Sequence, residues 1–244
     1  MDNEVAEAHG GAPGGATGTV MAPGNPDYDG AAPPDDWRAV YDFWFPAGLA
    51  STGLENHQRM HAWWLRGGAT AELPRFAPLL EAASRRELEP WAEHPLGRLA
   101  LIILLDQFPR GLHAGTPEAY SLDPHALALT EAGLANGQYA ALTDYWQRVF
   151  FTLPLIHAEG PDHLDRADRM IALVEVQLDE GPEHLRPIRE FGLGQARGHR
   201  EIIARFGRHP HRNEILGRST SPDEAIYLAT GAFVHHQRPP PVGA

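Results

Sequence analysis

The apolar residues of this chain recur with the period of an α-helix along most of its length. Trp37, Val40, Tyr41, Trp44 and Phe45 lie at positions i, i+3, i+4, i+7 and i+8, which places their side chains on one face of a helix. No run of alternating β-branched residues bounded by turns appears, so we expect an all-α fold with one helical domain. Further helices are predicted over Glu55–Arg66, Ala71–Ala83, Leu96–Phe108, Pro124–Ala135, Thr143–Phe151, Asp162–Asp179, Glu183–Phe206 and Pro222–Phe233.

Composition sets the expected limits of this domain. Residues 1–34 are rich in Gly, Ala and Pro and contain no arginine, so we expect a disordered tail that is neither a secretory signal nor a transit peptide. The helical domain is expected over residues 35–237, followed by a short disordered tail over residues 238–244. The longest apolar run, Leu99 to Leu105, is far shorter than the roughly 18 residues of a membrane span. We therefore expect a cytoplasmic protein.

Proline, glycine and capping residues predict where the helices begin and end. Gly67, Pro109, Pro154 and Gly181 are read as stop signals, because glycine favours the left-handed end of a helix and proline cannot continue one. The last helix opens with the sequence Ser-Pro-Asp-Glu at residues 221–224. This order predicts a capping box with proline in the first turn.

The charged residues restrict the chemistry that is open to the chain. It has no cysteine, and all 20 of its basic residues are arginine. Thiol nucleophiles, cysteine-ligated metals, Schiff-base lysines and the lysine of a phosphate-binding P-loop are therefore excluded. The formal net charge of -12 also argues against nucleic acids and anionic membranes as partners, because both attract basic surfaces.

In the segment LALIILLDQFPR, the apolar run from Leu99 to Leu105 is followed by a carboxylate, that of Asp106. It falls in the last turn of a predicted buried helix, where the helix dipole disfavours an anion. Asp106 therefore needs a cation. It either forms a buried ion pair with a C-terminal arginine or acts as a general base or ligand-orienting group. Arg110, in the turn after Pro109, either faces the mouth of a pocket or is exposed to solvent.

A second segment, FFTLPLIHAEG, carries His157 and Glu159 in what we expect to be irregular backbone after Pro154. Two such residues can reach one ligand or hydrogen-bond each other, which would set the tautomer of the imidazole and raise its basicity. The alternative is a purely structural histidine. We expect no metal ion and no cofactor, because the two-histidine spacing of zinc helices is missing and nearby arginines would repel a cation.

A third segment, RFGRHPHRNEILGR, concentrates four arginines, two histidines and an asparagine in fourteen residues of an acidic chain. Its first two arginines lie at the end of a predicted helix, where the dipole favours cations. Glycine and proline then stop the helix, so the next donors belong to a turn that can aim them at one point. Convergent donors of this kind suit a carboxylate or phosphate. The candidate anion-binding residues are Arg205, Arg208, His211, Arg212, Asn213 and Arg218.

The three segments, in this order and at these distances, resemble the signature blocks of the bacterial family catalogued as domain of unknown function 924. The opening VYDFWF, the pair Trp63-Trp64 and Trp91 fit its N-terminal pattern, so the resemblance covers about residues 37–233. The resemblance implies an all-helical fold similar to tetratricopeptide-like antiparallel helix arrays. It implies no particular activity, because none is established for the family. The family blocks select Asp106, Gln107, Arg110, His157, Glu159, Arg205, Arg208, His211, Arg212, Asn213 and Arg218.

Three hypotheses about function follow. In the first and favoured one, the segments converge around a small anionic metabolite, which is bound by the arginines and Gln107 and open to catalysis by Asp106, His157 and Glu159. In the second, a helical array docks an acidic peptide or a C-terminal carboxylate of a protein partner. In the third, the segments form only a buried salt-bridge network. The first hypothesis predicts that three acid–base residues and at least two of three C-terminal arginines converge in space. The acid–base residues are Asp106, His157 and Glu159, and the arginines are Arg205, Arg208 and Arg218.

Overall fold

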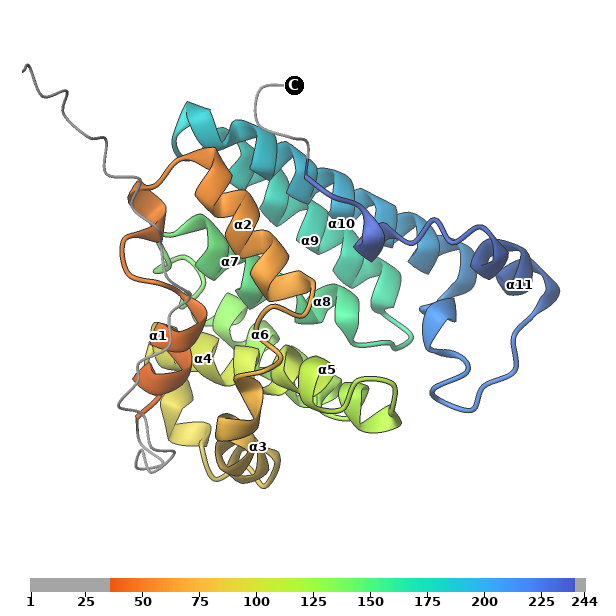
Figure 1. Cartoon of the computed structure of the whole chain (residues 1–244), viewed down its shortest axis with the longest axis horizontal. Helices are drawn as coiled ribbons and strands as arrows, with labels where there is room; N and C mark the ends of the chain where they lie inside the picture. Colours follow the sequence, from red (N-terminus) through yellow and green to blue (C-terminus); the bar gives the residue numbers. More distant parts are fainter. Residues whose placement is uncertain (1–35, 240–244) are drawn as a thin grey trace, which may run out of the picture.

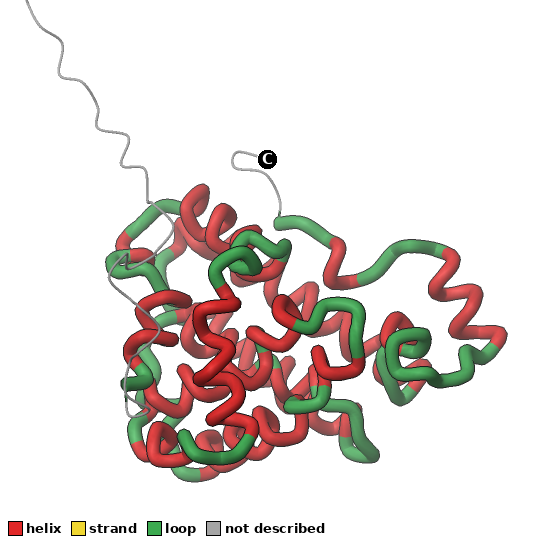
Figure 2. The backbone as a smooth tube through the Cα atoms, turned by 60° about the horizontal axis from the view of Figure 1, so that its bottom comes forward, coloured by secondary structure: helices red, strands yellow, loops and turns green. Residues whose placement is uncertain are grey.

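The computed structural model describes residues 36–239, and every regular element in that range is helical (Figure 2). The all-α prediction is confirmed. Apart from residues 238 and 239, the two predicted tails lie outside the described residues. The α-helices are α1 (Arg38–Trp44), α2 (Leu54–Leu65), α3 (Ala77–Ser84), α4 (Pro95–Asp106), α5 (Phe108–Leu112), α6 (Asp123–Ala135), α7 (Tyr145–Thr152), α8 (Pro154–His157), α9 (His163–Asp179), α10 (Arg186–Phe206) and α11 (Pro222–Ala229). Short 3-10 helices are η1 (Leu49–Ser51), η2 (Leu73–Phe76), η3 (Glu89–Glu93), η4 (Pro117–Tyr120), η5 (Glu183–Leu185), η6 (Pro210–Arg212) and η7 (Val234–His236).

Helix α4 is at the centre of the larger core. Each of its residues from Gly97 to Asp106 is buried, as expected for a helix that is apolar all round. Helices α1, α3, α6 and α7 pack against it. Gly97 allows one close approach, because a Cβ at this position would lie 2.2 Å from the carbonyl oxygen of Trp91. Because these neighbours enclose α4, the carboxylate of Asp106 at its C-terminal end lies in the interior of the protein.

The two longest helices, α9 and α10, lie side by side as a hairpin (Figure 1). Between them and their neighbours is a second, smaller core of Leu155, Ile156, Ala167, Met170, Val174, Leu193 and Ile203. The short helix α8 contacts α4 and α6 on one side and α9 on the other. It therefore joins the two cores, and His157 at its end lies between them.

Two prolines that are predicted to end helices lie in the first turn of new helices instead. Pro109 lies in the first turn of α5, and Pro154 lies in the first turn of α8. Proline is tolerated there because the first turn of a helix needs no backbone N–H donor. Arg110 and His157 are consequently helical, not part of a turn or irregular backbone. The predicted helix over 71–83 is divided into η2 and α3, whereas the capping box at Ser221 and Glu224 is confirmed.

The chain beyond α10 forms an arm that extends from the helices and then returns (Figure 1). Helix α10 ends at Gly207, whose φ of 68° is left-handed, and α11 lies at the far end of the arm. We call the returning residues 230–239 the C-terminal strap. Arg66 donates a hydrogen bond to the carbonyl oxygen of Gln237 at 2.6 Å, and Gln195 donates to its side chain at 2.8 Å. Within residues 36–239, no helix has the length and apolar character to cross a membrane.

Candidate functional site

A cavity of about 420 Å³ lies between α2, α7, α9 and α10 and is bordered by α5, α8, η6 and the strap. Small-molecule sites typically enclose about 300–1,000 Å³. Helix α10 runs along the cavity from Ile188 to His199, a length of about 16 Å at 1.5 Å per residue. We call the end near His199 the polar end, lined by Gln107, Arg110, Tyr120, His157, His199, His209, His211 and Arg212. The aromatic end, near Ile188, is lined by His61, Trp64, Tyr145, Trp146, Ile188 and Phe191.

At the polar end, a buried carboxylate orients a histidine. The Nδ1 atom of His157 lies 2.9 Å from each carboxylate oxygen of Asp106. An ionised carboxylate only accepts hydrogen bonds, so Nδ1 carries the proton. Nε2 then has no hydrogen-bond partner within the described part of the chain, and the ring borders the cavity. The pair thus presents a basic nitrogen to any ligand.

The surroundings set the charge of both groups. Burial alone would raise the pKa of Asp106, but Arg110, His157 and a hydrogen bond from Gln107 hold that pKa below its usual range. Burial lowers the pKa of the His157 ring, and Asp106 offsets this only in part. At neutral pH, Asp106 is therefore ionised and His157 is neutral, which is the state of a general base.

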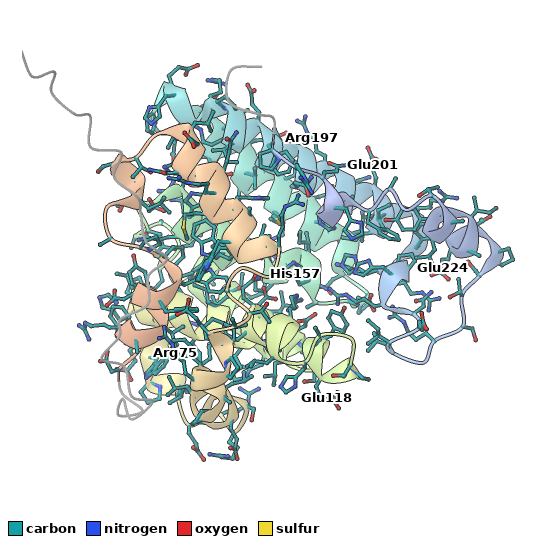
Figure 3. The ribbon with its side chains drawn as sticks, in the orientation of Figure 1. Arg75, Glu118, His157, Arg197, Glu201 and Glu224 are labelled. Carbon is teal, nitrogen blue, oxygen red and sulfur yellow. The ribbon has the colours of Figure 1, made fainter. Side chains whose placement is uncertain are left out.

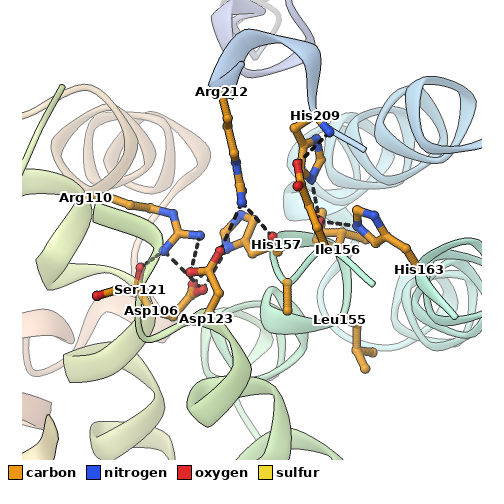
Figure 4. A network of polar contacts seen from close by, with 12 residues as sticks. Asp106, Arg110, Ser121, Asp123, Leu155, Ile156, His157, His163, His209 and Arg212 are labelled. Atoms are coloured by element: carbon orange, nitrogen blue, oxygen red, sulfur yellow. Dashed lines mark hydrogen bonds and ion pairs between the residues drawn. The ribbon is translucent and has the colours of Figure 1, made fainter. Parts of the chain in front are cut away.

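An ion-pair chain runs from this carboxylate to the C-terminal arm (Figure 4). Asp106 Oδ1 lies 3.3 Å from Nη1 of Arg110, whose Nη2 lies 2.9 Å from Oδ1 of Asp123. The second oxygen of Asp123 accepts from Nη1 of Arg212 at 3.0 Å. That same Nη1 donates to the carbonyl oxygen of His157 at 2.9 Å. Four helical segments thus meet around two arginines and two aspartates.

The guanidinium of Arg212 is held in one orientation and keeps donors unused. It lies over the ring of Tyr120, 4.3 Å from the ring centroid, and is only 4% exposed. Its Nη1 makes both hydrogen bonds described above. Its Nε is buried without a partner, and its Nη2 forms no hydrogen bond to any residue in the range 36–239. At the wall of the cavity, Arg212 therefore has N–H groups that are available to donate hydrogen bonds to a ligand.

Two further histidines fix the backbone beside His157. Nε2 of His209 and Nε2 of His163 lie 2.7 and 2.8 Å from the carbonyl oxygen of Ile156 (Figure 4). A carbonyl only accepts, so both nitrogens are protonated. Burial lowers the pKa of His209 well below its ordinary value, so this ring is neutral. The polar end consequently contains two neutral imidazoles, those of His157 and His209.

Glu159 is not the partner of His157, contrary to the expected acid–base pair. Its carboxylate binds the guanidinium of Arg218 and accepts from the backbone N–H of His209 at 2.8 Å. Burial would raise the pKa of Glu159, but Arg218 and the His209 N–H keep it below its usual range. His157 lies near the middle of the helices (Figure 3), with Asp106 as its carboxylate partner. Glu159 instead joins the end of α8 to the arm.

Several of the predicted anion-binding residues stabilise the arm and do not line the cavity. Arg208 forms an ion pair with Glu224 at 2.7 Å, on the arm (Figure 3). Arg218 donates to the side chain of Asn213 at 3.2 Å. Arg205 is exposed, with its guanidinium over the neighbouring phenyl ring. The expected convergence of Asp106 with two of these three arginines is wrong, because within residues 36–239 none of them pairs with that carboxylate. The structure places Arg110 beside Asp106 and brings in Arg212 through Asp123.

The structure also reveals site residues that the sequence pattern did not single out. Asp123 is 4% exposed and links the two arginines, although it precedes a proline and looks like an ordinary helix-starting residue. Tyr120 supplies the ring beneath Arg212. His61 and His199 contribute imidazoles to the cavity from α2 and α10. Each lies on a helix face among apolar residues. In the sequence, a histidine at such a position cannot be told from one that is merely packed in the core.

Comparison with known proteins supports the resemblance. A family model described as bacterial protein of unknown function (DUF924) matches residues 40–232. This chain belongs to that family. Among solved structures, this chain is similar to the protein of unknown function ATU0120 from Agrobacterium tumefaciens, with 34% sequence identity and a TM-score of 0.58. The match covers 80% of this chain and 97% of the Agrobacterium chain. No curated protein matches the chain.

Proposed function

We propose that the cavity binds a small anionic metabolite at its polar end and presents it to the Asp106–His157 pair. One observation carries this proposal. The chain contains 32 acidic and 20 basic residues. Among the residues that the structure describes, the cavity is nevertheless lined by three arginines and five histidines and by no carboxylate. Both aspartates of the ion-pair chain lie behind the groups that face the cavity. An anionic ligand in the cavity therefore contacts the N–H donors of arginines and no negatively charged side chain.

The arrangement favours anions through short-range contacts. Arg110 and Arg212 each offset an aspartate, so the four groups are close to neutral together. The attraction for an anion therefore comes from the N–H donors that face the cavity, above all the unused donors of Arg212. Charge-assisted hydrogen bonds of this kind are the stronger ones in proteins. The low exposure of the site strengthens them further.

The chemistry that this geometry supports is proton transfer. Nε2 of His157 is the free basic atom, and Asp106 holds the ring in the required tautomer and would stabilise the imidazolium. The same division of roles occurs wherever a carboxylate orients a catalytic histidine. In this proposal, Arg212 positions the anionic group and His157 accepts a proton from an adjacent part of the ligand or from water.

The test compares small carboxylates and phosphates with their neutral amide or ester analogues. We expect the anions, and not their neutral analogues, to raise the melting temperature of the full chain. Arg212→Gln should weaken their affinity by about tenfold or more in isothermal titration, because about 1.4 kcal/mol corresponds to tenfold and a charged hydrogen bond contributes about that much.

The matched control is Arg205→Gln, which removes the same charge from an exposed arginine outside the cavity. It should leave the affinity unchanged. Equal losses in the two variants would mean that net charge, and not the cavity, governs binding. A panel in which no anion raises the melting temperature would also contradict the proposed function.

A further inference from the structure

We infer that the ligand is an aryl-alkyl carboxylate with a hydroxyl group on the far side of its ring, bound with its carboxylate at the polar end and its hydroxyl beside His61. This inference rests on the proposed function, because that function supplies the position of the carboxylate. The aromatic end supplies the rest of the argument, through its length, its rings and one buried imidazole.

The distance between the two ends sets the length of the ligand. The rings of His61 and Phe191 are 5.4 Å apart between centroids, and those of His199 and His209 are 5.9 Å apart. Phe191 and His199 both lie on α10 and line the cavity. Eight residues of α-helix separate them, a rise of about 12 Å. A ligand that reaches both ends must therefore be extended, with a body of about that length.

The walls of the aromatic end favour an aromatic ring in the ligand. Trp64 and Trp146 lie 4.8 Å apart between ring centroids, tilted by 58°. Tyr145 lies 4.8 Å from Trp146 in an edge-to-face arrangement. Rings at such angles offer both faces and edges, and an inserted ring gains offset or edge-to-face contacts with them beyond the burial of its area. A flexible alkyl chain would gain only the burial of its area.

His61 is a polar group with no partner at this aromatic end. It is 7% exposed, and neither ring nitrogen forms a hydrogen bond to any residue in the range 36–239. Nδ1 is buried outright, while the side chain borders the cavity. Leaving a buried polar group without a hydrogen bond costs about 1–3 kcal/mol. The other buried histidine of α2 differs, because Nδ1 of His57 accepts from the indole of Trp146 at 2.8 Å.

A hydroxyl group is the partner that fits His61. Burial, together with the positive charge of Arg66, lowers the pKa of His61 to about 4, so the ring is neutral at physiological pH. It then holds one donor and one acceptor nitrogen. A hydroxyl can both donate and accept, and it therefore matches either tautomer. A second carboxylate would lose its hydration among the indole and phenyl rings. The cation nearest in effect, Arg66, already donates to the carbonyl oxygen of Gln237. The neutral hydroxyl avoids that cost.

The experiment uses a matched pair of probes, 3-phenylpropanoate and 3-(4-hydroxyphenyl)propanoate, and the pair with one more methylene, 4-phenylbutanoate and 4-(4-hydroxyphenyl)butanoate. Isothermal titration on the full chain should show that the hydroxyl lowers Kd by about tenfold in at least one pair. A tenfold change in Kd corresponds to about 1.4 kcal/mol, which is about the contribution of one hydrogen bond to a buried group. In His61→Phe this difference should vanish, while the affinity for the unhydroxylated probe is kept.

The outcomes separate the two proposals. If all four probes bind, lose affinity in Arg212→Gln and show no effect of the hydroxyl, the inference about His61 is wrong and the proposed function stands. The same holds if the hydroxyl effect survives in His61→Phe. If only short anions such as acetate and phosphate bind, the aromatic body is wrong. If no anion binds at all, both proposals fail. Should His61→Phe not fold, His61→Leu, which also lacks hydrogen-bonding atoms, makes the same comparison.

Discussion

At the scale of single residues, the site depends on a histidine whose protonation is balanced between opposing neighbours. Asp106 and Asp123 favour the imidazolium of His157, whereas burial and Arg110 disfavour it. Burial is the largest of these effects and lowers the pKa of the ring below its ordinary value of 6.5. A bound anion would add a further negative charge beside the ring and raise its pKa.

We therefore predict that anion binding is accompanied by proton uptake at His157 where the pH lies below the pKa of the ring in the complex. Above that pKa the ring of the complex stays neutral and remains a base. The free protein has the lower pKa and the complex the higher one, so affinity should rise as pH falls from 8 through the pKa of the complex. It should level off below the pKa of the free protein, with a slope of at most about tenfold per pH unit for one proton. Asp106 stays ionised throughout, because its pKa is held below the usual range.

Titration of one anion in two buffers of different ionisation enthalpy measures this uptake directly. His157→Gln should bind without it, and the pH dependence should flatten. Release of protons on binding, or equal uptake by the variant, would show that another group titrates.

At the scale of elements, the ion-pair chain joins three helices of the larger core to the C-terminal arm. Asp106 ends α4, Arg110 lies in α5, Asp123 begins α6 and Arg212 ends η6. The side chain of Asp106 is completely buried, and it lies behind the cavity wall. Its contribution is therefore to stability as well as to the orientation of His157.

We predict that Asp106→Asn lowers the free energy of unfolding by about 3 kcal/mol at neutral pH. Removal of one partner from a buried ion pair costs about 3–5 kcal/mol, and the lower figure applies because Arg110 keeps its contact with Asp123. Urea denaturation measures the change. The control is Asp168→Asn, which breaks a 2.8 Å ion pair with Arg200 on the surface and should cost less than about 1 kcal/mol. Equal effects would contradict a structural role for Asp106.

At the scale of the whole molecule, the charge of the protein opposes the charge of the proposed ligand. The chain carries a formal charge of -12, and the acidic side chains of residues 36–239 lie outside the cavity lining. Long-range forces should therefore repel an anion, which is held only once it reaches the arginines. Salt should screen the repulsion over the surface more than it screens buried contacts.

We predict that an anionic ligand associates faster when the ionic strength rises from about 0.01 to 0.15 M, since the screening length falls from about 30 to 8 Å. Stopped-flow measurement through the tryptophans that line the cavity can follow this rate. The neutral amide of the same ligand, where it binds, should show no such change. A rate that falls with salt would mean that a positive surface steers the ligand.

The amino-acid sequence by itself determined the helical class, the positions of most helices and the segments that supply the site. Helical periodicity and capping depend on neighbours along the chain, as in the capping box of Ser221. The segments around Asp106, His157 and Arg212 were likewise visible, because such groups beside apolar residues require partners.

Only the tertiary structure decided which partner each group has. His157 lies beside Asp106, fifty-one positions away, and not beside Glu159, two positions away. Arg212 reaches Asp123, eighty-nine positions away. These choices follow from the packing of α4, α6, α8 and η6, since a buried charge is paired by whichever opposite charge the folded helices bring within reach. The cavity and its unpartnered His61 arise in the same way, from the space that packed helices leave between them.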